Sequence, residues 1–134
     1  MSAGFDWPLR VYWEDTDAGG VVFYANYLKF FERGRTEWLR SLGFDQEVWR
    51  ARGCGMFVVS RVEVDYRASA RLDDRLRVNT RLLACGRASV RIAQSVWRTG
   101  DPDMLLCHGT IRAGWVDAQG RPGRFPQPLQ EALA

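Results

Sequence analysis

Apolar residues recur at helical spacing in the first part of the chain and at strand spacing from about residue 56 onward. The helical spacing predicts one long amphipathic helix over residues 24–42, with an apolar face made of Tyr24, Tyr27, Leu28, Phe31, Trp38, Leu39 and Leu42. Gly34 interrupts this face, and a glycine lowers the stability of a helix interior, so we expect another part of the protein to approach closely there. Gly43 stands where a helix C-cap is expected.

The segments around this helix are predicted to be short. Residues 1–8 read as an irregular arm, and residues 9–14 as a strand whose apolar face consists of Leu9, Val11 and Trp13. An acidic, glycine-containing turn is expected over residues 15–23, between this strand and the long helix. A second, short helix is expected over residues 44–52.

Alternating apolar and polar residues in the second half predict four more strands, at residues 56–67, 75–82, 90–96 and 104–117. Because the connections between them are short and rich in turn-forming residues, we expect the four to be antiparallel neighbours. Residues 118–126 read as a loop, and residues 128–134 as a closing helical turn.

One long helix and one sheet determine the expected fold. The helix covers its apolar face only by lying on the sheet. The chain is therefore predicted to form a single α+β domain over residues 1–134, with a central long helix wrapped by a curved, five-stranded antiparallel sheet. Such a sheet leaves its edges open, so we expect oligomerisation through an edge strand.

The composition is that of a globular protein, with 46% hydrophobic and 26% charged residues. No apolar run is long enough to span a bilayer, and the N-terminus lacks the pattern of a signal peptide. The three cysteines are widely spaced and odd in number, which predicts buried free thiols at Cys54, Cys85 and Cys107. We therefore expect a cytoplasmic protein.

The net charge of +3 comes almost entirely from arginine, since Lys29 is the only lysine. Guanidinium groups are suited to binding phosphates, but most surface arginines are simply solvated. No recognition motif accompanies the arginines and aromatics, so nucleic-acid binding is disfavoured.

The segment D-T-D-A-G-G, at residues 15–20, has two interpretations. It is a common composition for a polar turn that caps a helix. It also places two carboxylates and two glycines beside a helix start, where chemistry is favoured. The ligand pattern of an EF-hand is absent, and no G-K-[ST] follows the glycines as in a phosphate-binding loop.

The longer motif R-V-Y-W-E-D-T-D-A-G-G-V-V-F-Y-A-N-Y, followed by F-E-R-G-R-T-E-W-L, resembles the hot-dog-fold acyl-CoA thioesterases. It is most similar to the Tol–Pal-associated (YbgC-type) branch, which is related to 4-hydroxybenzoyl-CoA thioesterase. The segment F-V-V-S-R-V-E-V-D-Y-R-A-S-A-R-L-D-D extends the resemblance to nearly all of the chain except the C-terminal tail. The resemblance implies a hot-dog fold and hydrolysis of a short-chain aliphatic or aromatic acyl-CoA, with no metal or redox cofactor.

The resemblance also implies roles for residues of the motif. Asp17 corresponds to the catalytic carboxylate, which either attacks the thioester carbonyl or activates water; near a water-poor acyl site it would be poorly solvated. Asp15 is expected to shape the turn. Tyr24 corresponds to the position whose backbone N–H polarises the carbonyl, and Gly19 and Gly20 would let the backbone approach the acyl group. Many members of the Tol–Pal-associated branch carry histidine in place of Tyr24, which leaves the acyl preference open.

Coenzyme A carries phosphates, and the resemblance assigns them to Arg87 and Ser89, in a site shared between subunits of a homotetramer built from dimers. Ser60 is assigned to the substrate site on the same basis. Other basic candidates for binding the coenzyme are Arg61, Arg67 and Arg91, each of which could equally be a solvent-exposed strand residue without a ligand. A Tol–Pal or lipid-synthesis association follows from the resemblance alone.

Alternatives remain at this stage. Glu32 is a second candidate for the catalytic carboxylate, although an ion pair with Arg35 or Arg33 is the preferred interpretation. His108 is the only histidine and is read as structural. A hot-dog hydratase is disfavoured because no histidine lies near the motif, and a non-catalytic acyl-CoA-binding or scaffold protein is the second functional hypothesis.

Overall fold

The structure is a computed structural model, and it describes residues 4–134. One sheet contains the strands β1 (Phe5–Arg10), β2 (Met56–Tyr66), β3 (Arg75–Cys85), β4 (Ser89–Arg98) and β5 (Met104–Val116). The helices are α1 (Tyr27–Ser41), α2 (Gln46–Ala51) and α3 (Gln127–Leu133), with short 3₁₀ turns at Trp13–Asp15 and Tyr24–Asn26.

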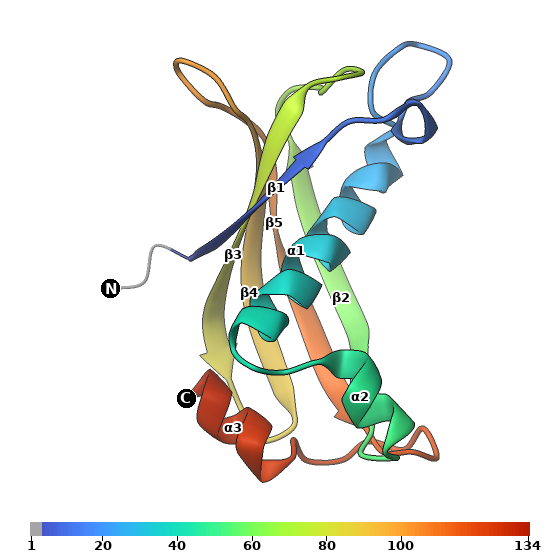
Figure 1. Ribbon diagram of the computed structural model, residues 1–134, viewed down its shortest axis with the longest axis vertical. Helices are drawn as coiled ribbons and strands as arrows, with labels where there is room; N and C mark the ends of the chain where they lie inside the picture. The colour runs from blue at the N-terminus through green and yellow to red at the C-terminus, as the bar shows by residue number, and fades with distance from the viewer. Residues whose placement is uncertain (1–3) are drawn as a thin grey trace.

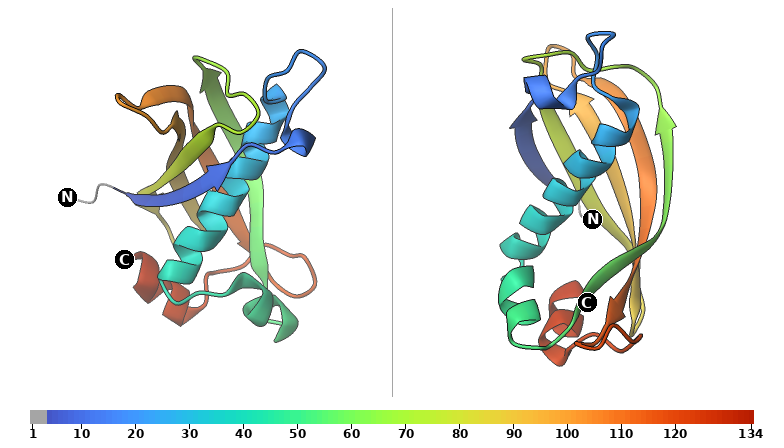
Figure 2. Two further views of the ribbon diagram at one scale, coloured as in Figure 1. Left: turned by 45° about the horizontal axis from the view of Figure 1, so that its top comes forward. Right: turned by 90° about the vertical axis from the view of Figure 1, so that its right-hand side faces the viewer.

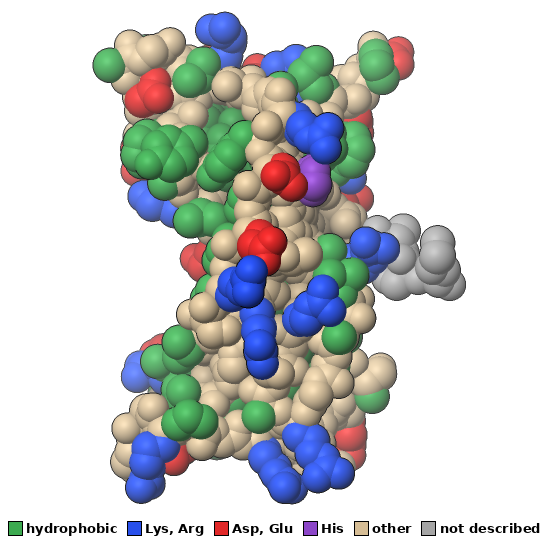
Figure 3. Space-filling model, turned by 180° about the vertical axis from the view of Figure 1, so that it is seen from behind, with side chains coloured by type: hydrophobic (Ala, Val, Ile, Leu, Met, Phe, Trp, Pro, Cys, Tyr) green, Lys and Arg blue, Asp and Glu red, His purple; other side chains and the backbone are tan. Residues whose placement is uncertain are grey.

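All neighbouring strands are antiparallel, in the order β1-β3-β4-β5-β2. The helix α1 crosses one face of the curved sheet, and α2 and α3 lie at its C-terminal end (Figures 1 and 2). No helix formed by residues 4–134 covers the opposite face, which carries many charged side chains (Figure 3). The predicted α+β architecture of a long helix wrapped by a five-stranded sheet is thus confirmed.

The position of β2 differs from the prediction. Strands β3, β4 and β5 are neighbours in chain order, but β2 does not pair with β3 and instead lies at the far edge, against β5. The link after β2 therefore crosses the end of the sheet rather than forming a hairpin. A short connection favours adjacency without requiring it.

The first strand also begins and ends earlier than predicted. Phe5–Arg10 is extended and pairs with β3, whereas the sequence placed an arm there. Pro8 is accommodated because β1 is an edge strand, where a missing N–H costs little. Trp13 lies in a 3₁₀ turn and is 80% exposed, so it does not share a face with buried Val11. Residues 1–3 of the predicted arm lie outside the described residues.

The buried face of α1 differs in part from the predicted one. Tyr27, Phe31, Trp38 and Leu39 are buried as expected, and so is Phe30, which the sequence analysis did not include. The predicted members Tyr24, Leu28 and Leu42 are exposed. The difference arises at the ends, since residues 24–26 form a 3₁₀ turn that points differently from the helix.

Gly34 is the point where α1 comes closest to the sheet. A Cβ atom there would lie 2.6 Å from Cγ1 of Val78, so the expected close approach is confirmed. Beside it, Nε2 of buried Gln94 donates to the Phe31 carbonyl at 2.9 Å and to Oγ1 of Thr80 at 2.8 Å. These bonds tie the helix backbone to strands β3 and β4.

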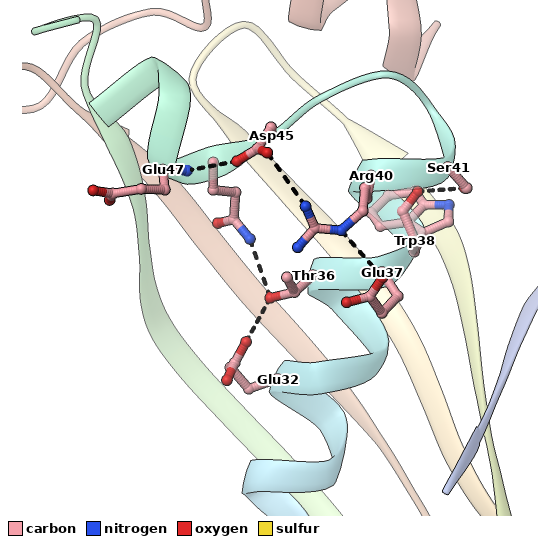
Figure 4. Close-up of polar contacts among 9 residues, drawn as sticks. Glu32, Thr36, Glu37, Trp38, Arg40, Ser41, Asp45 and Glu47 are labelled. Atoms are coloured by element: carbon pink, nitrogen blue, oxygen red, sulfur yellow. Dashed lines mark hydrogen bonds and ion pairs between the residues drawn. The ribbon is translucent and has the colours of Figure 1, made fainter. Parts of the chain in front are cut away.

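The junction between α1 and α2 is capped by Gly43, as predicted, and by Asp45, which the sequence analysis did not identify as a cap. Gly43 has φ of +85°, which suits glycine at a helix C-terminus. Oδ1 of Asp45 accepts hydrogen bonds from the N–H groups of Glu47 and Val48, at 3.2 and 3.4 Å, while its Oδ2 contacts Arg40 (Figure 4).

The three cysteines are free, as predicted, but only one of them is buried. Cys54 and Cys85 are exposed, so the prediction of burial was wrong for both. Burial raises the pKa of the Cys107 thiol to about 12. No helix among the described residues has the length and apolar character needed to cross a membrane.

Candidate active site

The segment between β1 and α1 is organised by Asp15, which is 3% exposed. Its Oδ2 accepts a hydrogen bond from the Tyr12 N–H at 2.8 Å, and its Oδ1 accepts one from Nδ2 of buried Asn26 at 2.9 Å. Its carbonyl accepts the Phe23 N–H at 3.0 Å. Asp15 therefore joins the start of the loop to the start of the helix, which is the shaping role expected for it.

Asp17 lies at the tip of this loop, in a tight hairpin. Its N–H donates to the Val21 carbonyl at 2.9 Å, and its own carbonyl accepts the Gly20 N–H at 3.0 Å. Gly20 has φ of +80°, which disfavours other residues there. Oδ1 of Asp17 accepts the Gly19 N–H at 2.8 Å, so the carboxylate is oriented by the hairpin itself.

The surroundings of Asp17 differ from the expectation of a poorly solvated carboxylate. The residue is exposed in the single chain, as are Gly19 and Gly20. The described part of the chain therefore leaves this hairpin open to water. Within one chain, therefore, the carboxylate is held in place but not desolvated.

Tyr24 follows directly and begins the 3₁₀ turn that leads into α1. The first N–H groups of a helical turn have no partners within it. In the described part of the chain, no acceptor is found for the Tyr24 N–H. Its phenol ring is 65% exposed. An unpaired N–H at the positive end of a helix is suited to stabilising an oxyanion.

Tyr66, at the end of β2, holds this turn from the sheet side. Its hydroxyl donates to the Tyr24 carbonyl at 2.8 Å, and the two rings meet edge to face with centroids 6.2 Å apart. Partial burial is the main cause of the raised pKa of the Tyr66 phenol. The bond holds the Tyr24 carbonyl and so ties the turn that leads into α1 to the end of β2.

The residues assigned to the coenzyme lie at the other end of the molecule. Arg87 is exposed in the turn between β3 and β4, and its carbonyl accepts the Phe125 N–H at 2.8 Å, beside α3. The loop over residues 16–22 lies at the opposite end of α1 (Figure 1). Ser89 is half-buried in a hollow that includes Gly86. Ser60 forms a bulge in β2, where its hydroxyl donates to the Arg112 carbonyl at 3.3 Å.

Glu32 is exposed on α1 and accepts a hydrogen bond from the Thr36 hydroxyl. The preferred ion pair with Arg35 or Arg33 is not found between these described residues. Arg35 instead donates from Nη1 to Oε1 of Gln94 at 3.0 Å, and the Arg33 guanidinium lies 5.9 Å from the centroid of the Phe30 ring. The predicted close ion pair is therefore not formed, although the charge of Glu32 still acts on Arg35 and partly opposes the lowering of its pKa.

His108 lies on β5, on the outer face of the sheet. Its Nε2 is 3.4 Å from Nη2 of Arg67 and 3.9 Å from Oδ2 of Asp65. Arg61 pairs with Glu63 at 2.7 Å on the same face, and Arg91 lines a shallow hollow next to it. The recorded side-chain partners of His108 are therefore on the sheet and not in the Asp17 hairpin, and its structural role remains a prediction.

A family model described as the thioesterase-like superfamily matches residues 11–133 of the chain. The chain belongs to the thioesterase-like superfamily. The match covers the hairpin, α1, strands β2 to β5 and α3, so it includes every site residue predicted from the sequence.

Relatives of this thioesterase-like protein include an acyl-CoA thioesterase YbgC from Haemophilus influenzae. The two are 41% identical over 134 residues, which is 99% of this chain and 96% of the relative. An acyl-CoA thioester hydrolase YbgC from Escherichia coli O6:H1 is 47% identical over 92 residues, or 69% of this chain and 68% of that protein. A probable thioesterase from Bartonella henselae superimposes with a TM-score of 0.86 at 33% identity, covering 92% of this chain and all (100%) of that one.

Sequence reasoning missed two residues that shape this thioesterase-like site, Asn26 and Tyr66. Asn26 is a polar residue between two tyrosines at the predicted helix start, and its burial depends on the partner Asp15. Tyr66 was read only as an apolar strand position. The available signal was the hydroxyl of a tyrosine at a strand end, since a partly buried hydroxyl usually finds an acceptor.

Proposed function

We propose that this protein hydrolyses a short-chain aliphatic or aromatic acyl-CoA to the free acid and coenzyme A. Asp17 is the nucleophile or the general base, and the Tyr24 N–H is the oxyanion donor. The observation that supports this assignment is the pairing of a hairpin-held carboxylate with an unpaired N–H at the adjoining helix start. Membership of the thioesterase-like superfamily and the YbgC relatives supply the reaction class.

Two routes satisfy this arrangement. As a nucleophile, an Asp17 oxygen bonds to the thioester carbon, the thiolate of coenzyme A leaves and takes up a proton, and water then cleaves the acyl–Asp17 anhydride. As a general base, Asp17 accepts a proton from water while the water oxygen attacks, and the thiolate leaves and is protonated. In both routes negative charge forms on the carbonyl oxygen, where a single oxyanion donor commonly contributes about 10²–10³ in rate.

The remaining parts of the site are proposed as follows. Gly19 and Gly20 let the backbone approach the acyl group, Ser60 belongs to the substrate site, and Arg87 and Ser89 bind the coenzyme A phosphates. The loop over residues 16–22 and the turn between β3 and β4 lie at opposite ends of the sheet (Figure 1). The complete site therefore combines Asp17 of one subunit with Arg87 of another.

We propose a homotetramer built from dimers. The edge strand β2 exposes Met56, Val58, Val59 and Val62, and an apolar edge of this kind favours pairing with a second chain. A second chain would also cover the exposed Asp17 hairpin and exclude water from it. A cytoplasmic location, which was inferred from the cysteine pattern and the N-terminal sequence, remains a prediction. A Tol–Pal or lipid-synthesis association rests on the resemblance and also remains a prediction.

The decisive test is thiol release from a panel of acyl-CoAs by the wild-type protein and by Asp17→Asn. We expect Asp17→Asn to lower kcat by about 10²-fold or more while coenzyme A binding and the melting temperature stay close to wild type. Wild-type protein that binds acyl-CoA without releasing thiol would instead identify a binding or scaffold protein. Loss of turnover in Glu32→Gln but not in Asp17→Asn would move the site onto α1.

A further inference from the structure

A cavity of about 210 Å³ lies between α1, the start of α2 and the inner face of the sheet. Its floor is apolar and includes the buried residues Leu39, Val90, Ile92 and Ala113. Val59, on the exposed edge strand β2, lies at its border. Asp17 and Tyr24 do not line this cavity, so it is separate from the hairpin site within one chain.

One wall of the cavity carries a cation that is poorly compensated. Arg35 is half-buried, and among the described residues it forms no ion pair. A guanidinium has five N–H donors, and the hydrogen bond found here goes to the neutral amide oxygen of Gln94. Burial lowers the pKa of Arg35, and the charge of Glu32 only partly opposes this. Buried cations are rarely left without an anionic partner.

The nearest carboxylate is already engaged elsewhere. Glu32 accepts from the Thr36 hydroxyl, and Nε2 of Gln46 donates to the same hydroxyl oxygen at 3.2 Å. Figure 4 shows this chain of contacts running from α1 to the residue that begins α2. It forms a polar rim on the cavity and leaves the remaining donors of Arg35 available to a ligand.

We propose that this cavity binds an aliphatic monocarboxylate, with its carboxylate on Arg35 and its hydrocarbon chain against the apolar floor. A volume of 210 Å³ holds about seven groups of the size of a water molecule, at about 30 Å³ each, which matches a medium-length chain. Such an acid is also the product class of the proposed hydrolysis, but the site stands whether or not Asp17 is catalytic. Binding and turnover therefore test the two proposals separately.

The test is calorimetric titration of the full chain with acetate, hexanoate and octanoate. Each buried methylene contributes about 0.8 kcal/mol, so affinity should rise about fourfold per methylene until the cavity is filled. Arg35→Gln should weaken octanoate binding about 10- to 100-fold, as expected for a lost charge-assisted hydrogen bond. Arg33→Gln, the same change at an exposed neighbour on α1, should leave binding unchanged.

Two further variants test the proposal even if the Arg35→Gln protein does not fold. Ala113→Leu fills the floor of the cavity without touching the guanidinium, so it should abolish the gain from hexanoate to octanoate. Glu32→Gln removes a negative charge near the bound carboxylate and should tighten binding. The proposal is overturned if octanoate does not bind saturably, as when a second chain covers the opening, or if Arg35→Gln and Arg33→Gln bind it equally well.

Discussion

Asp15 and Asp17 are the same residue type two positions apart, yet their surroundings give them different roles. Asp15 is buried, and its two carboxylate oxygens accept hydrogen bonds from the Tyr12 N–H and the Asn26 side-chain amide. Asp17 is open to solvent and uses one oxygen on its own hairpin. A buried acceptor stabilises the fold, whereas an exposed and oriented carboxylate remains available for chemistry.

This contrast predicts that the change from aspartate to asparagine affects stability very differently at the two positions. Asp15→Asn places an amide nitrogen against a backbone N–H or the Asn26 amide, so the free energy of unfolding should fall by about 1–3 kcal/mol. Asp17→Asn should change it by less than about 0.5 kcal/mol, as is usual for exposed sites. Urea unfolding followed by circular dichroism measures both, and equal stabilities would contradict the role given to Asp15.

At the scale of elements, the contact between α1 and the sheet depends on the absence of one side chain. Gly34 allows Val78 to pack against the helix backbone, and Gln94 donates to the backbone one turn earlier. Alanine is a better helix former than glycine by about 1 kcal/mol, so helix propensity alone would favour alanine at position 34. The close packing of Val78 against the helix requires glycine there instead.

We therefore expect Gly34→Ala to destabilise the protein by about 1–3 kcal/mol, the usual range for overpacking. The new Cβ would meet Cγ1 of Val78 at 2.6 Å, inside a buried cluster that has little room to move. Thermal unfolding gives the measurement. Val78→Ala in the Gly34→Ala background should recover part of the loss, and additive effects would show that the two residues are not coupled.

The elements that the sequence predicted correctly are those governed by local periodicity. The buried face of α1 around Phe31 and Leu39, and the alternation of β3 to β5, follow from spacing alone. The placement of β2 beside β5 was not predictable in this way, because it depends on how the sheet closes over the helix. The start of β1 was missed because Pro8 is tolerated only at an edge, and edges are a property of the finished sheet.

In the candidate site, too, the sequence predicted the features that depend on neighbouring residues and missed those that depend on distant ones. Asp17, Gly20 and Tyr24 come together because they are close in sequence, so the motif located them. The bond from Tyr66 to the Tyr24 carbonyl joins residues far apart in the chain, so the sequence indicated only that the Tyr66 hydroxyl needed an acceptor and not which acceptor it finds. In the proposed site, Asp17 and Arg87 belong to different chains, and a single sequence does not show how two chains pack.

At the scale of the molecule, the two halves of the proposed substrate site are separated along α1. Arg87 is exposed, and in the proposed site it contacts the coenzyme A phosphates at a distance from the thioester, so this contact would be similar in the ground and transition states. Arg87→Ala should raise KM about 10- to 100-fold through loss of a charge-assisted contact, with kcat little changed. Steady-state kinetics measure both constants. On a truncated thioester without the nucleotide, mutant and wild type should be alike; equal impairment there would give Arg87 a structural role.

The separation of Asp17 from Arg87 predicts that two impaired variants can restore activity when their chains assemble together. If each site takes its carboxylate from one chain and its phosphate ligand from another, a mixed dimer of Asp17→Asn and Arg87→Ala subunits has one site with both defects and one with neither. Co-expression of the two impaired variants would then restore thioesterase activity in the mixed dimers. Chains that carry their own complete sites would show no such rescue, because every site in the mixture would still contain one defect.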